Sequence, residues 1–418
     1  MNLLIRSATV IDKKSEFHNK NVDILVKNGI ISNIEKNIKN PKNFKELNFN
    51  NLSISPGWFD YGVSTGEPGF EERDNLLNTL SVAAKSGFTS VGIQPNTNPI
   101  IDKSTEIEYL KSLASKSNID IYPIGALTKE SKGNELSEIL EMGENGAIGF
   151  GDFKKPIENP NLLKLALLYS KDQNYPIFSF PFEKKINGDG VINEGVTSTL
   201  LGLKGIPSIT EELNIMRDLA ILEYTGGHLH IPTISTAKSV DIIKKAKAKK
   251  LNISCSTSIN NLFFNDSEIL NYNTNFKVFP PLRSQNDVNS LIKGVKEGVI
   301  DMVTSDHNPL NIELKNLEFD NADFGSIGLE SFYGALNKIF SSKTTIDILT
   351  RGKQIFNIKN SVIKIGELAD LTLFNPSKDY IFNKEHIHSI SKNSIFTETK
   401  LKGIVYGTIS NGKLTTNE

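Results

Sequence analysis

The sequence predicts an α/β protein in which a (β/α)8 TIM barrel is joined to a small β-domain made from both ends of the chain. Short strand-like runs separated by polar turns occupy the two ends. Between them, eight β-rich runs alternate with helical stretches over roughly 300 residues, a pattern typical of a parallel barrel. No G-x-G-x-x-G turn follows an early strand, as an open doubly wound sheet with a dinucleotide site would require.

The two ends have similar textures, with short β-rich runs and turns such as Lys27-Asn28-Gly29 and Asn411-Gly412. We expect them to pair into one small β-sandwich domain. Its amino-terminal part is predicted at 1–52 and its carboxyl-terminal part at 356–418, on either side of a barrel at 53–355. The expected strands are 3–11, 22–26, 30–34, 370–374, 404–406 and 408–409.

The central region supplies the barrel. Its strands are predicted at 52–60, 89–94, 119–127, 147–151, 176–182, 228–234, 252–256 and 299–306. Its clearest helices are predicted at 75–85, 211–223, 236–249 and 287–296. In such a barrel the chemistry lies at the carboxyl ends of the strands, so the residues that end each run are the candidates for a functional site.

Composition indicates an ordinary globular protein. The chain has 418 residues, 38% hydrophobic and 23% charged, with a formal net charge of −1. This balance gives no electrostatic reason to expect nucleic acid or an acidic membrane as a partner. The basic run Lys244–Lys250 is expected to be the solvated face of a helix.

A single cysteine, Cys255, excludes an intramolecular disulfide and a cysteine-based zinc site, and fits a reducing compartment. We expect it to be a small buried hydrophobic residue, because no histidine flanks it to activate a nucleophile. The chain begins without a signal-peptide pattern and contains no run long enough for a membrane span. We therefore expect a cytoplasmic protein.

Several segments, in order and with characteristic spacing, identify a family. They are PGWFDYGVSTGEPG at 56–69, PNTNPIID at 95–102, NEGVTSTLLGLKGIP at 193–207, HIPTIST at 230–236, KVFPPLR at 277–283, GVIDMVTSDHNP at 298–309 and GELADLTLFNP at 366–376. With these segments the chain resembles dihydroorotase and its allantoinase and dihydropyrimidinase relatives in the amidohydrolase superfamily. The resemblance runs nearly end to end.

The resemblance implies a pair of zinc ions at the barrel mouth that polarise a ring carbonyl and generate hydroxide, with an aspartate moving the proton. The implied ligands are two histidines after the first strand, a carboxylated lysine or an aspartate after the fourth, histidines after the fifth and sixth, and an aspartate after the eighth. In this chain the histidine places hold Gly62, Ser64, Phe180 and Thr233. The place of the substrate-binding arginine holds Gly66.

Some family positions are retained. Asp306 stands at the proton-shuttle position, and His307 and Asn96 stand at substrate-contact positions. Asp152, near Lys154 and Lys155, and His230 are possible remnants of the metal site together with Asp306. Other substrate positions are changed, because Phe279 replaces the asparagine before the Pro-Pro pair and Asn260-Asn261-Leu262 replaces His-His-Leu.

These substitutions leave three hypotheses. The first is a dihydroorotase-like protein of pyrimidine biosynthesis that is catalytically inactive and acts as a structural or regulatory partner in a homo- or hetero-oligomer. Under this hypothesis we expect no bound metal or other cofactor. By family analogy that partner is aspartate transcarbamoylase. The second is a cyclic-amide hydrolase with an atypical metal site that uses Asp306, His307, His230 and Asp152, or a relocated single metal among His228, His230 and His307. The third is a small-ligand sensor that uses the vacated pocket.

Overall fold

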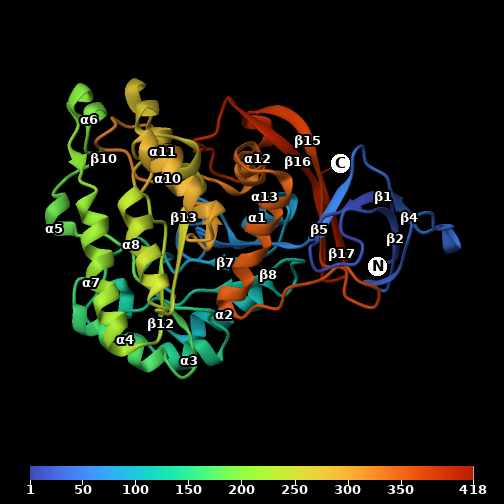
Figure 1. The fold of residues 1–418 in the computed structure, drawn as a ribbon, viewed down its shortest axis with the longest axis horizontal. Helices are drawn as coiled ribbons and strands as arrows, with labels where there is room; N and C mark the ends of the chain where they lie inside the picture. The colour runs from blue at the N-terminus through green and yellow to red at the C-terminus, as the bar shows by residue number, and fades with distance from the viewer. Residues whose placement is uncertain (418) are drawn as a thin grey trace.

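The computed structural model describes residues 1–417 and consists of a closed barrel beside a β-domain (Figure 1). Neighbouring barrel strands pair in parallel, and the circle closes where Val63 bridges His307. The strands are β6 (Trp58–Val63), β7 (Phe88–Ile93), β8 (Asp120–Pro123), β9 (Pro176–Phe178), β12 (His228–Ile231), β13 (Ile253–Ser258) and β14 (Met302–Thr304). The architecture is the predicted TIM barrel with an added β-sandwich domain.

The fourth barrel position is less regular than predicted. Instead of a strand at 147–151, only single bridges from Phe150 to Gly125 and to Ile177 connect β8 to β9. Three glycines, Gly146, Gly149 and Gly151, surround this point, and glycine weakens regular strand pairing. The chain leaves the barrel wall here early, which positions residues 152–159 at the mouth.

Barrel strands such as β7, β12 and β13 are buried along their whole length, because helices cover their outer faces, whereas β8 is exposed where it begins, at Asp120. Several helices start where a polar residue caps them, as Asn75, Thr236 and Ser284 do by accepting backbone N–H groups. The main helices are α1 (Leu76–Lys85), α2 (Ser104–Ala114), α4 (Pro160–Ser170), α7 (Ile209–Thr225), α8 (Ala237–Ala248), α10 (Gln285–Lys296), α12 (Leu329–Ile339) and α13 (Ser342–Arg351).

Shorter elements lie in the connections between them. The short helices are α3 (Ile139–Glu144), α5 (Lys184–Asn187), α6 (Val196–Leu201), α9 (Ile259–Phe263) and α11 (Ile312–Lys315). A two-stranded pair, β10 (Ile192–Asn193) and β11 (Gly205–Ile206), flanks α6. Short 3-10 helices occur at Pro41–Asn43, Lys129–Ser131, Asp266–Asn271, Thr274–Phe276, Gly352–Phe356 and Lys384–His386.

The β-domain combines both ends of the chain in one sheet with its own hydrophobic core, which includes Ile5, Ile24, Ile54 and Leu371. Its strand order is β17 (Lys413–Thr416), β16 (Thr399–Ser410), β15 (Leu371–Phe382), β5 (Ser53–Pro56), β1 (Leu3–Val10), β2 (Asn21–Lys27) and β3 (Ile30–Glu35), and β4 (Lys45–Leu47) pairs with β1. Figure 1 shows the blue amino-terminal and red carboxyl-terminal strands together at one side of the barrel.

The run 52–60, predicted as one barrel strand, is two strands. β5 pairs with β1 and β15 in the β-domain, and β6 pairs with β7 in the barrel. Gly57 separates them, in a space where a Cβ would lie 2.0 Å from Thr89 Oγ1. The division at 52/53 and 355/356 stays a prediction, although β5 lies on the β-domain side of the joint.

The basic run at 244–250 lies at the end of α8, and three of its lysines form ion pairs, with Glu297, Asp301 and Glu223. It is therefore a largely neutralised helix surface. Within residues 1–417 no helix is both long enough and apolar enough to cross a membrane. Cys255 is buried, as expected, and its thiol faces Val299 O at 3.4 Å.

Candidate functional site

The end of β6 is held by a buried carboxylate. Asp60 accepts hydrogen bonds from Thr304 Oγ1 (2.7 Å) and Ser305 N (3.1 Å), and also from the Ser305 hydroxyl. Burial raises the pKa of Asp60, and these hydrogen bonds oppose that rise. The carboxylate thereby fastens the first barrel strand to the last.

The same contact fills the space beside Gly62. A Cβ built at Gly62 would lie 1.8 Å from Thr304 Oγ1, and one built at Gly66 would lie 2.0 Å from Phe70 O. Neither position has room for the side chain that the family resemblance implies there. The two glycines therefore belong to a repacked strand end.

At the barrel mouth, Lys154 forms an ion pair with Asp306, the carboxylate retained from the family pattern. Lys154 Nζ lies 2.8 Å from Asp306 Oδ1 and 2.9 Å from Oδ2, and both side chains are largely buried. Burial raises the pKa of Asp306, and the Lys154 ammonium opposes the rise. Sequence reasoning placed Lys154 near Asp152 but missed this pair, because the two residues are 152 positions apart.

Apolar rings close much of the mouth. Phe279 contacts Phe180, Phe182 and Phe324, with ring centroids 5.2, 4.9 and 5.3 Å away. A cavity of only about 30 Å³ remains between the Lys154–Asp306 ion pair and the barrel wall. It is lined in part by Tyr61, Lys154, Phe178, Phe180, Thr233 and Asp306. This space has room for about one water molecule.

The two histidines of β12 share one serine inside the barrel. Ser254 Oγ lies 3.0 Å from His228 Nε2 and 2.8 Å from His230 Nδ1. On the mouth side, Ser256 Oγ lies 3.3 Å from His230 Nε2 and 2.5 Å from the Tyr61 hydroxyl. Burial lowers the pKa of His228 to about 4 and lowers that of His230 well below its ordinary value. These imidazoles are neutral members of an internal hydrogen-bond chain.

The other predicted site residues lie apart from this chain. His307 Nδ1 accepts from Gly328 N at 3.1 Å, and burial lowers the His307 pKa to about 4. Asp152 accepts from Thr128 N (3.0 Å) and Thr128 Oγ1 (2.6 Å), joining two mouth loops. Asn96 is half-buried at its strand end, and its Oδ1 has no partner among residues 1–417.

The retained residues do not assemble into a metal centre. In the described chain, no group of three or more His, Cys, Asp or Glu side chains is placed to hold a metal ion. Asp306 binds an ammonium, and His230 is occupied by two serines. The residues present therefore do not fit the two-zinc site that the family resemblance implies.

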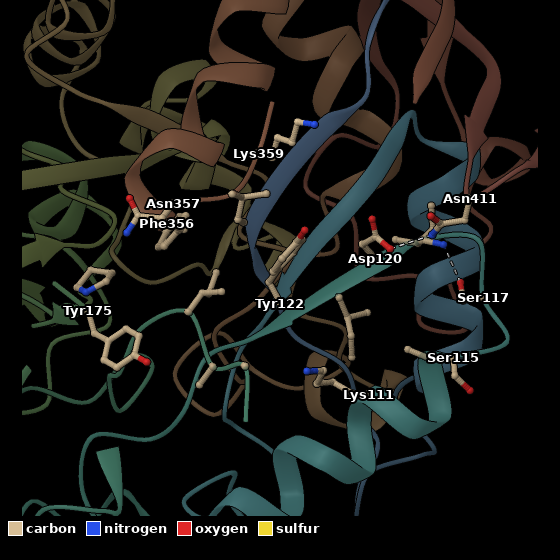
Figure 2. Close-up of a pocket in the computed structure, with 18 of the residues that line it drawn as sticks. Lys111, Ser115, Ser117, Asp120, Tyr122, Tyr175, Phe356, Asn357, Lys359 and Asn411 are labelled. Atoms are coloured by element: carbon tan, nitrogen blue, oxygen red, sulfur yellow. Dashed lines mark hydrogen bonds between the residues drawn. The ribbon is translucent and has the colours of Figure 1, made fainter. Parts of the chain in front are cut away.

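A second cavity, of about 700 Å³, lies at the other end of the barrel (Figure 2). Tyr122 and Asp120 of β8, Phe356, and Asn411 of the β-domain line it, and Asn411 Nδ2 donates to Asp120 Oδ1 at 2.8 Å. It opens where strands begin, whereas functional groups of such barrels gather where strands end. The mouth is therefore the candidate site.

Comparison with known proteins places this architecture in a family. The dihydro-orotase-like family model matches residues 53–239, and the amidohydrolase family model matches residues 188–415. Dihydroorotase of Thermoanaerobacter sp. (strain X514) is 36% identical over 99% of this chain and 97% of its own length. Dihydroorotase of Caldicellulosiruptor saccharolyticus is 38% identical, with coverage of 99% and 98%. The chain belongs to the dihydroorotase family.

Solved structures agree with the fold of this dihydroorotase family member. L-Hydantoinase (dihydropyrimidinase) from Arthrobacter aurescens superposes with a TM-score of 0.84 at 19% identity, covering 99% of this chain and 96% of that one. D-Hydantoinase from Thermus sp. gives 0.82 at 19% identity, covering 99% and 95%. The relatives named dihydroorotase support a dihydroorotase-type function, and the amidohydrolase family usually binds zinc.

Proposed function

We propose that this member of the dihydroorotase family fulfils its role by binding and not by metal-dependent ring opening. The observation that carries the proposal is the Lys154 ammonium within hydrogen-bond distance of both oxygens of Asp306. A divalent cation at Asp306 would have to displace this lysine or lie beside a like charge in a buried place, and both are unfavourable.

The repacked strand end supports the same proposal. Any side chain added at Gly62 would overlap Thr304. Phe180 places a buried phenyl ring where a metal ligand would be needed. A phenyl ring and a glycine offer no lone pair to a metal. Two independent strand ends thus lack the donors that a zinc-bound hydroxide requires.

A second candidate is an active cyclic-amide hydrolase that interconverts N-carbamoyl-aspartate and dihydroorotate. The names of the relatives favour it, because proteins called dihydroorotase are 33 to 38% identical over nearly the whole chain. This candidate corresponds to the second hypothesis from the sequence, and the relatives support it better than they support an inactive role. It would need a metal arrangement other than the one implied by the family positions.

One experiment separates the two candidates. The protein is produced in a host that lacks dihydroorotase, its zinc is measured by elemental analysis, and dihydroorotate formation and hydrolysis are both assayed. The binding proposal expects less than one tightly held zinc per chain and no turnover. Stoichiometric metal with turnover that Asp306→Ala abolishes would establish the hydrolase.

For the binding role we propose aspartate transcarbamoylase as partner, by analogy with the preceding step of pyrimidine synthesis. The two proteins from one organism should co-elute in size-exclusion chromatography with light scattering, as a hetero-oligomer of defined mass. Independent elution, with a fully assembled transcarbamoylase alone, would remove the partner proposal and leave the metal and turnover results intact.

A further inference from the structure

A large cleft lies beside the closed barrel mouth. Its volume is about 800 Å³, within the range of small-molecule sites, and it is formed by loops that follow several barrel strands. Lys154 lines both this cleft and the small cavity at the mouth, so the two spaces adjoin. The lining that matters here is Lys132, Lys155, Lys184, Asn187, Phe182 and Phe279.

Cations outnumber anions around the cleft. Four lysines line it, against the two carboxyl groups of Asp152 and Glu158. Asp152 is engaged with Thr128, and burial raises its pKa. Glu158 is exposed at the rim. A cleft with an excess of one sign of charge concentrates ligands of the other sign.

Among residues 1–417, two of these lysines have no carboxylate partner. Lys154 pairs with Asp306, and Lys132 pairs with Glu130. Lys155 Nζ donates to the Ser131 carbonyl at 3.3 Å, and neither Lys155 nor Lys184 forms an ion pair within residues 1–417. Lys155 follows the fourth barrel position and Lys184 lies on α5, so the two free ammonium groups come from different segments of the wall.

The remaining wall is aromatic, and the adjoining cavity is lined by a residue with an unpaired hydroxyl. Phe182 and Phe279 are half-buried and meet edge to face at 4.9 Å, which leaves ring surface toward the cleft that they line. Thr233 Oγ1, of a residue that lines the adjoining cavity, has no hydrogen-bond partner among the described residues. Thr233 is 5% exposed, and an unpaired buried hydroxyl is costly unless a ligand or water completes it.

We propose that this cleft binds a phosphorylated small molecule that carries a flat ring, such as a nucleoside diphosphate. The two free ammonium groups suit the several charged oxygens of a diphosphate better than a single carboxylate. The phenylalanine faces suit a planar ring. This inference rests on the proposed binding role, because a hydrolase would need the same mouth for a metal-bound cyclic amide.

The test is calorimetric titration of the full-length protein in low-salt buffer with inorganic pyrophosphate, ADP and UDP, and with dihydroorotate as the monocarboxylate comparison. We expect the nucleoside diphosphates to bind more tightly than pyrophosphate, and dihydroorotate to bind most weakly. Raising the salt concentration should weaken binding of the diphosphates, because the contacts are between exposed charges.

Variants locate the site. Lys155→Ala and Lys184→Ala should each raise Kd about tenfold, the size of one lost charge-assisted hydrogen bond. Lys185→Ala is the matched control, because Lys185 neighbours Lys184 on α5 but does not line the cleft. Phe182→Ala should weaken ADP and UDP while leaving pyrophosphate within about twofold.

Absence of heat with all three phosphates overturns the inference, as does binding that Lys185→Ala weakens as much as Lys184→Ala. Equal affinity for dihydroorotate and the diphosphates overturns the phosphate assignment. These outcomes are independent of the zinc and turnover measurements, so failure of the cleft and failure of the proposed function are read separately. Circular dichroism of each variant confirms that the fold is intact before binding is compared.

Discussion

At the residue scale, Asp306 shows how a buried negative charge at the barrel mouth is compensated. A carboxylate 7% exposed is destabilising unless a cation or several donors compensate it. Here a single lysine side chain, supplied by the loop that leaves the barrel early at Phe150, provides the compensation. The charge balance of the site therefore depends on one side chain of the protein itself.

The first prediction concerns this pair. Lys154→Met leaves Asp306 buried without a counter-ion and should lower the free energy of unfolding by about 3 to 5 kcal/mol at pH 7. In the Lys154→Met/Asp306→Asn double variant most of that loss should disappear. Urea denaturation of wild type, Lys154→Met, Asp306→Asn and the double variant measures the coupling energy of the pair, with Lys185→Met as an exposed control. Additive losses in the double variant would mean that the ion pair is energetically unimportant.

At the element scale, the sequence predicts strands and helices well and their endpoints poorly. Runs such as 89–94 and 236–249 agree closely with β7 and α8, because alternation, apolar periodicity and caps are local signals. The split of 52–60 at Gly57 and the loss of regular pairing at 147–151 depend on which sheet accepts each strand. That information lies in distant partners such as β15 and Thr89, which local patterns do not contain.

The candidate site divides in the same way. The family positions identified the strand ends and the missing donors at Gly62, Phe180 and Thr233 directly from the sequence. The replacements for those donors, Thr304 beside Gly62 and Lys154 on Asp306, could not be foreseen, since each joins residues more than 150 positions apart. The retained His230 likewise gave no sign that two serines occupy both of its nitrogens.

The second prediction concerns the end of β6. Gly62→His should lower the free energy of unfolding by about 2 kcal/mol or more, because the new Cβ would overlap Thr304 Oγ1. In a Thr304→Ala background the same substitution should cost clearly less. Thermal unfolding by calorimetry measures both. Gly195→Ala is the control, because its Cβ would meet only Asn193 Nδ2, at 3.7 Å. Equal costs in the two backgrounds would show that the contact does not limit this position.

At the scale of the whole molecule, three histidines are buried without charge inside one barrel. Burial lowers the pKa of His228 and His307 to about 4 and that of His230 further below its ordinary value. The unfolded chain binds protons to these groups at higher pH than the folded chain does. Their contribution to stability is therefore complete above about pH 6.5 and is lost as pH falls toward 4.

The third prediction isolates one of these groups. Between pH 7 and pH 5, His228 alone should remove about 2 kcal/mol from the free energy of unfolding. Buried carboxyls with raised pKa, such as Asp74 at about 6, act in the opposite direction over this range, so wild type is compared with His228→Gln. The variant should be less stable at pH 7 and show a shallower loss at pH 5 in urea denaturation. Parallel pH profiles would mean that the pKa of His228 is the same in the folded and the unfolded chain.

The joint at Gly57 has a consequence for how such a protein can evolve. Pro56 pairs with Leu371 in the β-domain, Trp58 begins the barrel, and the Trp58 indole donates to Ser55 Oγ across the joint at 2.8 Å. With one residue between two sheets there is no linker at which recombination could cut. At this crossing, any exchange of the β-domain for another would have to cut within the paired strands that join it to the barrel.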